Sequence, residues 1–217
     1  ENIEPFITDK TKAIMVNTPS NPTGAVFSEE TVRMIMELAE KYDLYVISDE
    51  IYDFLIYEGK HCSLKALDKD GRVILISGAS KKYAMTGWRI GYLIASEKII
   101  ALVNQMMVAM MGNATAVAQK AVEAAITGPQ DFVGFSIKDY KARRDAAAAI
   151  FQEEQVGFSY PHGAFYMMVD ISCCGMDSEE FALKLLAEEH VGVAPGGTFG
   201  KSTSQMIRIS CGTEMDN

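Results

Sequence analysis

Basic residues and hydroxyl groups follow an apolar run of the chain at residues 73–77. Lys81 and Lys82 come directly after Ser77-Gly78-Ala79-Ser80, and Arg89 follows Lys81 by eight residues. A lysine held beside apolar groups loses its charge more readily, and its neutral amine can attack a carbonyl carbon. Hydroxyl groups and a guanidinium suit a phosphate monoester. For this segment alone a solvated basic loop is an equal alternative, and Lys81, which is nearer the run, is the better candidate nucleophile.

An acid and a phenol follow another apolar run, at residues 44–48. Asp49 comes directly after that run, and Tyr52 follows three residues later, within one helical turn. If the run is a strand of a parallel sheet, both side chains would face the edge where such sheets bind ligands. For this pair alone, a helix cap at Asp49-Glu50 is the commoner interpretation.

Two further polar residues lie next to apolar runs, where a polar side chain needs a partner. Asn21, in Asn21-Pro22-Thr23-Gly24, offers an amide after the first apolar run, although these four residues are also a good turn sequence. Arg208 lies between Ile207 and Ile209, where its charge needs a carboxylate partner. That carboxylate belongs either to the protein or to a ligand, and the two alternatives weigh equally.

The apolar runs before these residues predict the strands of one sheet. Both faces of each run are apolar, and a helix over 28–42, which Ser28-Glu29-Glu30 announces, separates the first two runs. The pattern predicts an α/β fold with a largely parallel sheet covered on both sides. The expected strands are residues 13–17, 44–48, 73–77 and 90–95.

A change of composition after Ser96 predicts a second part of the chain. Ala- and Met-rich helices follow, parted near Gly112-Asn113, and Gly128-Pro129 marks a clear break. We place the domain boundary there, with residues 1–127 in one domain and residues 128–217 in a smaller α+β domain. The expected elements of the smaller domain are helices over 131–155 and 178–189 and strands at 165–170, 191 and 206–210.

The composition is that of a folded, acidic, globular chain. Its 217 residues carry 20 Lys and Arg against 29 Asp and Glu, a formal charge of -9, and 48% of them are hydrophobic. The negative charge disfavours nucleic acid and anionic membranes as partners, and Asn and Gln interrupt the uncharged stretch at 99–119. The cysteines lack C-x-x-C spacing and the histidines are far apart, so we expect reduced thiols, a cytoplasmic location and no metal site.

Taken together, these motifs resemble the class I and II, or aspartate aminotransferase-like, family of pyridoxal-phosphate-dependent enzymes of fold type I. The resemblance covers the whole chain, and the block GASKKYAMTGWRIG with its eight-residue interval from Lys81 to Arg89 is highly specific. It implies a mixed, mostly parallel sheet that belongs to the family's large, cofactor-binding domain. The matching segments, in family order, are Ser20–Gly24, Ser48–Tyr52, Gly78–Gly91, Gly163–Tyr166 and Arg208–Ser210.

The resemblance implies a catalytic role for Lys81, Asp49 and Tyr52. Lys81 would form a Schiff base with the aldehyde of pyridoxal 5'-phosphate and later move the proton between the substrate α-carbon and the cofactor. Asp49 would bind the pyridine nitrogen and keep it protonated. Tyr52 would hydrogen-bond the ring oxygen next to the imine.

The resemblance also implies four further binding residues. Asn21 would share the ring oxygen with the tyrosine and would contact the substrate as well. Ser80 and Arg89 would hold the cofactor phosphate, and Arg208 would bind the α-carboxylate of the substrate as a bidentate fork. It further gives equal weight to a cis and a trans Asn21-Pro22 bond.

The chain departs from the family pattern in three ways. Gly78 stands where many relatives have a phosphate-binding serine. The family's N-terminal part is missing, and Glu214-Met215-Asp216-Asn217 resembles the start of a last helix that the chain does not contain. We therefore expect the whole protein to transfer amino groups between an α-amino acid and a 2-oxo acid as a homodimer, and these 217 residues alone to do so little or not at all.

Two other functions stay open on the sequence alone. A carbon-sulfur β-lyase would share the lysine, aspartate and arginine, but such lyases often have His where this chain has Tyr52. An aminotransferase-like ligand-sensing domain of a transcription regulator would need a basic DNA-binding segment before residue 1. Nothing within this acidic chain favours a DNA partner.

Overall fold

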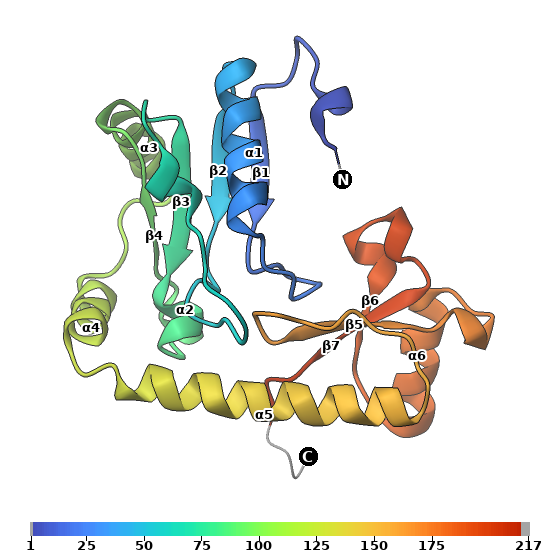
Figure 1. Ribbon diagram of the computed structural model, residues 1–217. Coiled ribbons are helices and arrows are strands. Elements are labelled where there is room, and N and C mark those ends of the chain that lie inside the picture. Colours follow the sequence, from blue (N-terminus) through green and yellow to red (C-terminus); the bar gives the residue numbers. More distant parts are fainter. Residues whose placement is uncertain (1, 214–217) are drawn as a thin grey trace. The chain divides into compact units, whose positions relative to one another are not determined.

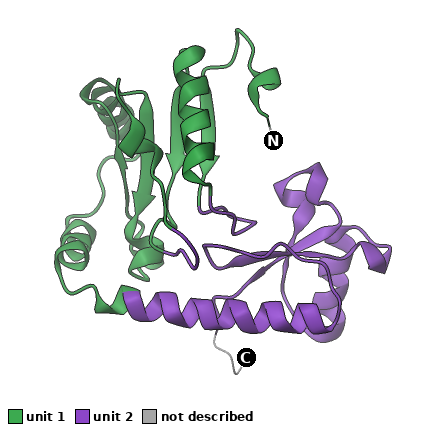
Figure 2. Cartoon of the chain, in the orientation of Figure 1, with its two compact units in different colours: residues 1–18, 27–54, 60–133 green, residues 19–26, 55–59, 134–217 purple. Residues whose placement is uncertain are grey.

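The computed structural model describes residues 2–213 of the chain. The chain divides into two compact units, which Figure 2 shows in green and purple: unit 1 is residues 1–18, 27–54 and 60–133, and unit 2 is residues 19–26, 55–59 and 134–217. The predicted domain boundary at Gly128-Pro129 stays a prediction. The helix start expected at Glu214-Met215-Asp216-Asn217 lies outside the described residues.

Unit 1 is built on a four-stranded sheet (Figure 1). Strands β1 (Ala13–Asn17), β2 (Tyr45–Asp49) and β3 (Val73–Gly78) are parallel neighbours in that order, and β4 (Gly91–Ile94) pairs antiparallel with β3. Parallel strands need a crossover connection, which α1 (Glu29–Lys41) provides between β1 and β2. The prediction of an α/β fold with a mixed, mostly parallel sheet is confirmed.

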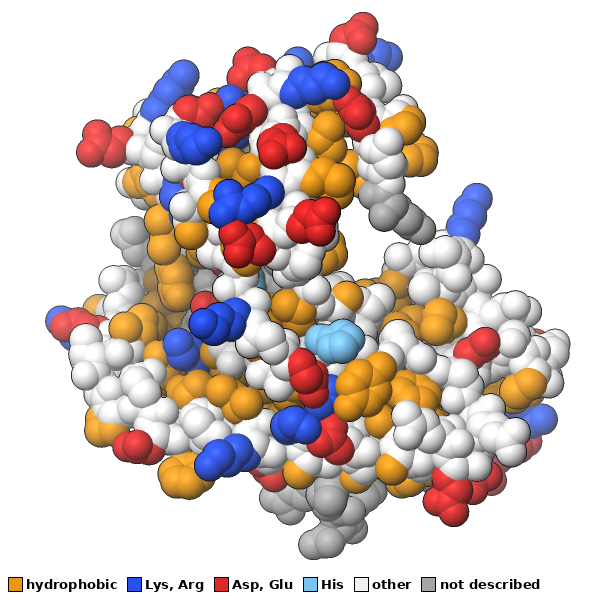
Figure 3. Space-filling model, in the orientation of Figure 1, with side chains coloured by type: hydrophobic (Ala, Val, Ile, Leu, Met, Phe, Trp, Pro, Cys, Tyr) orange, Lys and Arg blue, Asp and Glu red, His pale blue; other side chains and the backbone are white. Residues whose placement is uncertain are grey.

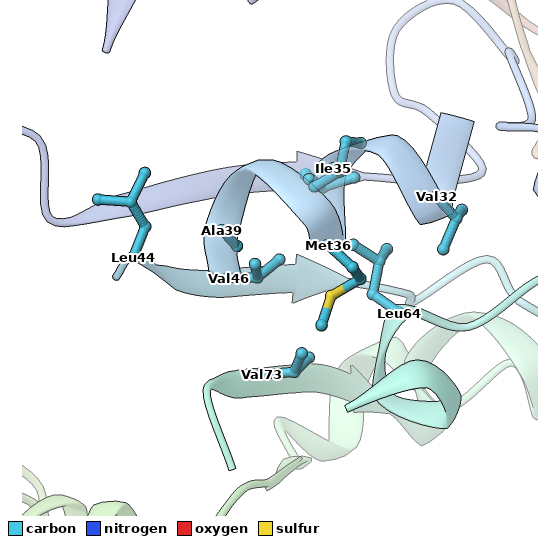
Figure 4. Packing of buried hydrophobic residues seen from close by; sticks show 9 residues of the cluster. Val32, Ile35, Met36, Ala39, Leu44, Val46, Leu64 and Val73 are labelled. Carbon is cyan, nitrogen blue, oxygen red and sulfur yellow. The ribbon is translucent and has the colours of Figure 1, made fainter. Parts of the chain in front are cut away.

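Helix α1 covers one face of this sheet. The hydroxyl of Ser28 accepts a hydrogen bond from the N–H of Thr31 and so caps the first turn. On the outer side, acidic and basic side chains are intermixed (Figure 3), among them the ion pair of Glu29 with Arg33 one turn later. Each large apolar side chain buried on the inner side contributes about 1.5–3 kcal/mol. Figure 4 shows this core, which consists of Val16, Val32, Ile35, Met36, Ala39, Leu44, Val46, Leu64 and Val73.

The opposite face of the sheet carries exposed apolar side chains. The strand register assigns Met15, Tyr45 and Ile76 to the face away from α1, where they are 73%, 46% and 40% exposed. The prediction of a sheet covered on both sides is therefore not met at these positions of the described residues. Asp49 is the register partner of Ile76 and projects from the same face.

The rest of unit 1 is helical. Helix α2 (Ala79–Lys82) follows β3 directly, and α3 (Glu97–Met110) and α4 (Ala116–Thr127) are the predicted Ala- and Met-rich helices. No helix within the described residues is long and apolar enough to cross a membrane. Short 3-10 turns lie at Glu4–Phe6, Leu64–Leu67 and Thr86–Trp88.

Unit 2 combines a three-stranded antiparallel sheet with helices. Strand β7 (Met206–Ser210) lies between β5 (Tyr166–Asp170) and β6 (Ala194–Pro195). The strand predicted at Val191 is wrong, because pairing with β7 begins only at Ala194. The helices are α5 (Asp131–Glu153), most of which belongs to this unit, α6 (Ser178–Glu189) and 3-10 turns at Ser172–Cys174, Gly196–Phe199 and Lys201–Thr203. The buried core consists of Ala148, Met167, Val169, Ile171 and Ile207.

Two short segments from the first third of the chain belong to unit 2. The N–H of Gly163 donates to the carbonyl of Gly24 at 2.9 Å, which ties down residues 19–26. Gly163 also forms an isolated antiparallel bridge with Ile56, which ties down residues 55–59. These bonds join residues more than a hundred positions apart, so no local pattern in the sequence predicts them.

Candidate active site

The acid predicted after the second apolar run ends strand β2. Asp49 is the last residue of β2, is half-buried, and its Oδ1 accepts a hydrogen bond from the N–H of Ile51 at 3.2 Å. Residues 51–54 form turns and no helix, so the alternative of a helix cap at Asp49-Glu50 is wrong. The turn instead fixes a carboxylate at the carboxyl end of a parallel strand, the edge where such sheets bind ligands.

Tyr52 lies in this same turn and is buried, with 3% of its surface exposed. The turn is held on both sides of Glu50, whose carbonyl accepts the N–H of Asp53 at 3.0 Å and whose own N–H donates to the carbonyl of Ile76 at 2.9 Å. The backbone that carries Tyr52 is therefore fixed to the neighbouring strand β3.

A buried polar cluster anchors the side of the turn that faces away from solvent. The Glu50 carboxylate, 3% exposed, accepts hydrogen bonds from the hydroxyls of Ser48 (2.8 Å) and Ser63 (3.0 Å), and its Oε2 lies 2.7 Å from Nε2 of His61. Burial alone would raise the pKa of Glu50, but the hydrogen bonds from His61, Ser48 and Ser63 outweigh burial and hold the pKa below its ordinary value. The sequence interpretation missed this cluster, for which the one signal was a glutamate directly after a buried strand.

Lys81 lies in α2, the single helical turn after β3. Strands β2 and β3 are parallel neighbours, with Asp49 opposite Ile76, so Lys81 and Asp49 lie at the same edge of the sheet. Lys81 is half-buried. The adjacent Lys82 has its Nζ 5.7 Å from the centre of the Tyr83 ring.

The loop after α2 links Ser80 to Arg89 by hydrogen bonds. Oγ1 of Thr86 donates to the carbonyl of Ser80 at 3.0 Å, and Nη1 of Arg89 donates to the carbonyl of Thr86 at 3.0 Å. Arg89 has a left-handed backbone, with φ +53°, and is exposed. The hydroxyl and the guanidinium predicted for a phosphate thus belong to one linked loop at the end of β3.

Gly78 lies where β4 approaches β3 most closely. A Cβ atom at this position would lie 3.1 Å from both the Cα of Gly91 and the carbonyl oxygen of Ile90, and 3.4 Å from the Ile51 side chain. Any side chain here would require the backbone of β4 to shift. This close approach of the two strands favours glycine at position 78.

Arg208 and Asn21 form a pair within unit 2. Nη1 of Arg208 donates to Oδ1 of Asn21 at 2.8 Å, and the Asn21-Pro22 bond is cis. The guanidinium lies 4.3 Å from the ring centre of Tyr166 and 5.0 Å from that of Phe199. Among residues 2–213, Arg208 forms no ion pair with a carboxylate, and the two sequence alternatives, a structural ion pair and a ligand carboxylate, both stay predictions.

The structure therefore gathers the predicted residues into two groups. Unit 1 brings five of them to the carboxyl edge of its sheet: Asp49, Tyr52, Ser80, Lys81 and Arg89. Unit 2 pairs Asn21 with Arg208.

Comparison with known proteins identifies relatives along the whole chain. The sequence pattern of the family described as aminotransferase class I and II matches residues 1–217. A probable aspartate aminotransferase of Methanocaldococcus jannaschii is 40% identical over 100% of this chain and 58% of its own length. An aspartate aminotransferase of Bacillus subtilis is 37% identical over 100% of this chain and 57% of its own length. The chain thus spans a little under three fifths of these relatives.

Solved structures agree with this comparison. An aromatic aminotransferase from Pyrococcus horikoshii superposes with a TM-score of 0.95 at 34% identity, over 99% of this chain and 58% of that protein. An aspartate aminotransferase from Thermotoga maritima superposes with a TM-score of 0.91 at 32% identity, over 99% of this chain and 55% of that protein. With the sequence pattern matched from end to end, the chain belongs to the class I and II aminotransferase family.

Proposed function

We propose that the whole protein is a pyridoxal-phosphate-dependent aminotransferase that moves an amino group between an α-amino acid and a 2-oxo acid. The observation that carries this proposal is that Lys81 and Asp49 lie at the same edge of one parallel sheet. Membership of the family supports it, since aminotransferases of class I and II use pyridoxal 5'-phosphate. The names of the relatives, which are aspartate and aromatic aminotransferases, also support it.

The side chains of unit 1 fit this cofactor by the chemistry of their donors and acceptors. A pyridine nitrogen that carries a proton needs an acceptor, for which we propose Asp49, and the ring oxygen needs a donor, for which we propose Tyr52. The phosphate needs hydroxyl and guanidinium donors, and Ser80 and Arg89 lie in one linked loop. Lys81 supplies the amine for the aldehyde.

Each of these groups would perform a simple step. When bound, the cofactor supplies a protonated ring that accepts the electrons left at the substrate α-carbon. Asp49 would hold the proton on the ring nitrogen, and the hydrogen bond from Ile51 keeps its Oδ1 in place. Nζ of Lys81 would carry the proton between the substrate α-carbon and the cofactor carbon, because an amine held near the reacting carbons can act first as general base and then as general acid. Tyr52 is buried, so its hydroxyl would keep one orientation.

For the α-carboxylate of the substrate we propose Arg208. A planar guanidinium can donate two parallel hydrogen bonds to a carboxylate. Asn21, Tyr166 and Phe199 already restrict its orientation, so binding would cost less conformational entropy. We assign Asn21 the two roles that the resemblance gives it, a partner of the substrate and a donor to the cofactor oxygen.

We propose glutamate or aspartate as one amino donor, which the relatives named aspartate aminotransferase support. Aminotransferases are typically dimers, and we propose a homodimer for the whole protein. We propose neither nucleic acid nor a membrane as a partner. A cytoplasmic location is proposed because Cys62, Cys173, Cys174 and Cys211 are free thiols, which is usual for a reducing compartment.

The test is to label the whole protein with pyridoxal phosphate, reduce it with borohydride and map the labelled peptide. We expect the label on Lys81 and its displacement by aspartate or glutamate. Lys81→Ala should lose the label and slow amino transfer from aspartate to 2-oxoglutarate at least about 100-fold. Lys82→Ala, the matched control at the next position, should keep both. Undiminished transfer by Lys81→Ala would contradict the proposal, and pyruvate and ammonia formed from cystathionine would instead indicate a β-lyase.

A further inference from the structure

Arg144, in the middle of α5, is a buried charge that the proposed chemistry does not use. Its side chain is 1% exposed. Nη2 donates to Oε1 of Glu58 at 2.7 Å and Nη1 donates to Oε2 at 3.2 Å, so the two side chains form a forked pair. The guanidinium also lies 4.5 Å from the ring centres of both Tyr57 and Tyr160. A buried guanidinium held by so many partners has a fixed position.

Arg144 also holds the turn that begins at Pro161, because Nη1 donates to the Pro161 carbonyl. The next two residues of this turn, His162 and Gly163, both donate their N–H groups to the carbonyl of Gly24 at 2.9 Å. Gly24 has φ +69°, and a Cβ atom there would lie 2.2 Å from the Cβ of Pro161. The two turns are therefore in direct contact, with no room between them.

The turn that contains Gly24 also contains Asn21. The N–H of Ser20 donates to the carbonyl of Ala25, and the N–H of Gly24 donates to the carbonyl of Ser20, both at 2.8 Å. These bonds close the turn, so its position follows that of Gly24. Within it, Asn21 accepts the hydrogen bond from Arg208.

We propose that Arg144 is a positioning residue for the pair of Asn21 and Arg208, and that it thereby sets the affinity of the protein for the carboxylate of the substrate. The inference rests on the proposed function for the role of Arg208. Lysine at position 144 would keep the charge. It could not keep the forked bond to Glu58 together with the bond to Pro161, because an ammonium is a point donor without the planar geometry of guanidinium.

The test compares Arg144→Lys with Arg143→Lys in the whole protein with its cofactor bound. Arg143 is a matched control, since it lies next to Arg144 on α5 and donates to the Asp139 carboxylate and the Gly212 carbonyl, which lie outside the turns at 20–25 and 160–164. In Arg144→Lys, we expect the amides of residues 20–25 and 160–164 to exchange hydrogen at least about fivefold faster. The Kd for maleate, a dicarboxylate without an amino group, and the KM for the amino acid should rise about tenfold, with kcat changed less than about twofold.

A double variant tests whether Arg144 acts through the proposed route. In an Asn21→Ala background, Arg144→Lys should change the maleate Kd less than about twofold, because the contact that it positions is already absent. If the maleate Kd of the double variant instead rises by the product of the fold-changes of the two single variants, the inference is wrong. It is also wrong if Arg144→Lys matches Arg143→Lys in both exchange and maleate affinity.

Two further outcomes can be told apart from failure of the inference: a variant that does not fold, and failure of the proposed function. If Arg144→Lys does not fold, Glu58→Gln is the substitute, because it keeps the arginine. We expect it to raise the amide exchange rates and the maleate Kd about threefold. An unchanged maleate Kd in Glu58→Gln would overturn the inference. If the proposed function itself fails, the unmodified protein will transfer no amino group and bind no maleate. The hydrogen-exchange comparison then still decides whether Arg144 positions the turn.

Discussion

Replacing Glu50 by glutamine tests how the turn after β2 is held. One oxygen of the carboxylate accepts hydrogen bonds from Ser48 and Ser63, and the other faces His61. Glutamine keeps the volume of the side chain and one acceptor oxygen. It removes the negative charge, and it puts an amide donor where the second oxygen was.

The magnitude follows from the number and kind of these contacts. A hydrogen bond to a charged group contributes about 1.5–3 kcal/mol, against about 0.5–1.5 kcal/mol for a neutral pair. The two hydroxyl bonds to Glu50 should each weaken by about 1 kcal/mol, and the bond to His61 is lost or reversed. A neutral amide costs less to bury than a carboxylate, which offsets part of the loss. We expect Glu50→Gln to lower the free energy of unfolding by about 2 kcal/mol at pH 7.

The effect should depend on pH in a defined direction. The pKa of Glu50 in the folded protein lies below its ordinary value of 4.5. A carboxyl group with a lowered folded pKa stabilises the fold above its unfolded pKa, and this contribution is lost as the pH falls through the folded pKa. The difference in unfolding free energy between the unmodified protein and Glu50→Gln should therefore be complete near pH 7 and shrink below about pH 4.5.

The assay is urea unfolding at a series of pH values, followed by circular dichroism. Glu29→Gln is the matched control, since Glu29 is 62% exposed and pairs with Arg33 on the surface of α1. That substitution should change the unfolding free energy by less than about 1 kcal/mol. The reasoning is refuted if Glu50→Gln costs no more than this control, or if its cost grows as the pH is lowered.

Two further predictions concern packing and backbone conformation. Leu64 is fully buried in the core of unit 1, and Leu64→Ala should lower the unfolding free energy in urea by about 2–5 kcal/mol. Leu183→Ala, at a position 62% exposed, should cost less than about 1 kcal/mol, and equal losses at the two positions would contradict this core assignment. Gly24→Ala combines a left-handed backbone with a Cβ overlap at Pro161, and should cost about 2–4 kcal/mol in the same assay. A loss too small to measure would show that the turn can move away.

The elements of unit 1 could be predicted from the sequence because their signals are local. Apolar runs of strand length and the cap at Ser28 fix the strands and α1 without reference to the rest of the chain. The order of strand, helix and strand implies parallel neighbours, and this topology is what brings Asp49 and Lys81 to one edge. Their chemistry could therefore be anticipated from two short motifs.

The supports of the site could not be predicted, because no local pattern in the sequence specifies which of their side chains meet. Arg144 and Glu58 are 86 positions apart, and nothing local to Arg143-Arg144 in the sequence indicates that one of the two is buried. The residues next to His61 in the sequence likewise give no sign of its buried partner. Its contact with Glu50 depends on how the loop after β2 returns to the sheet, which no local pattern specifies.

Glu50 and Arg144, two buried charges among the residues that the structure describes, have a common feature. A buried ion pair or charge network brings little net stability, because the cost of removing charges from water cancels most of the attraction between them. Stability alone therefore does not explain why either charge is there.

Glu50 is bonded into the turn that carries Tyr52, and Arg144 is bonded into the turn that contacts Gly24 beside Asn21. Charged hydrogen bonds are directional, whereas apolar packing tolerates sliding, so buried charges at these positions fix the backbone that presents the binding residues. On this argument, Arg144→Lys should affect substrate affinity more strongly than it affects global unfolding.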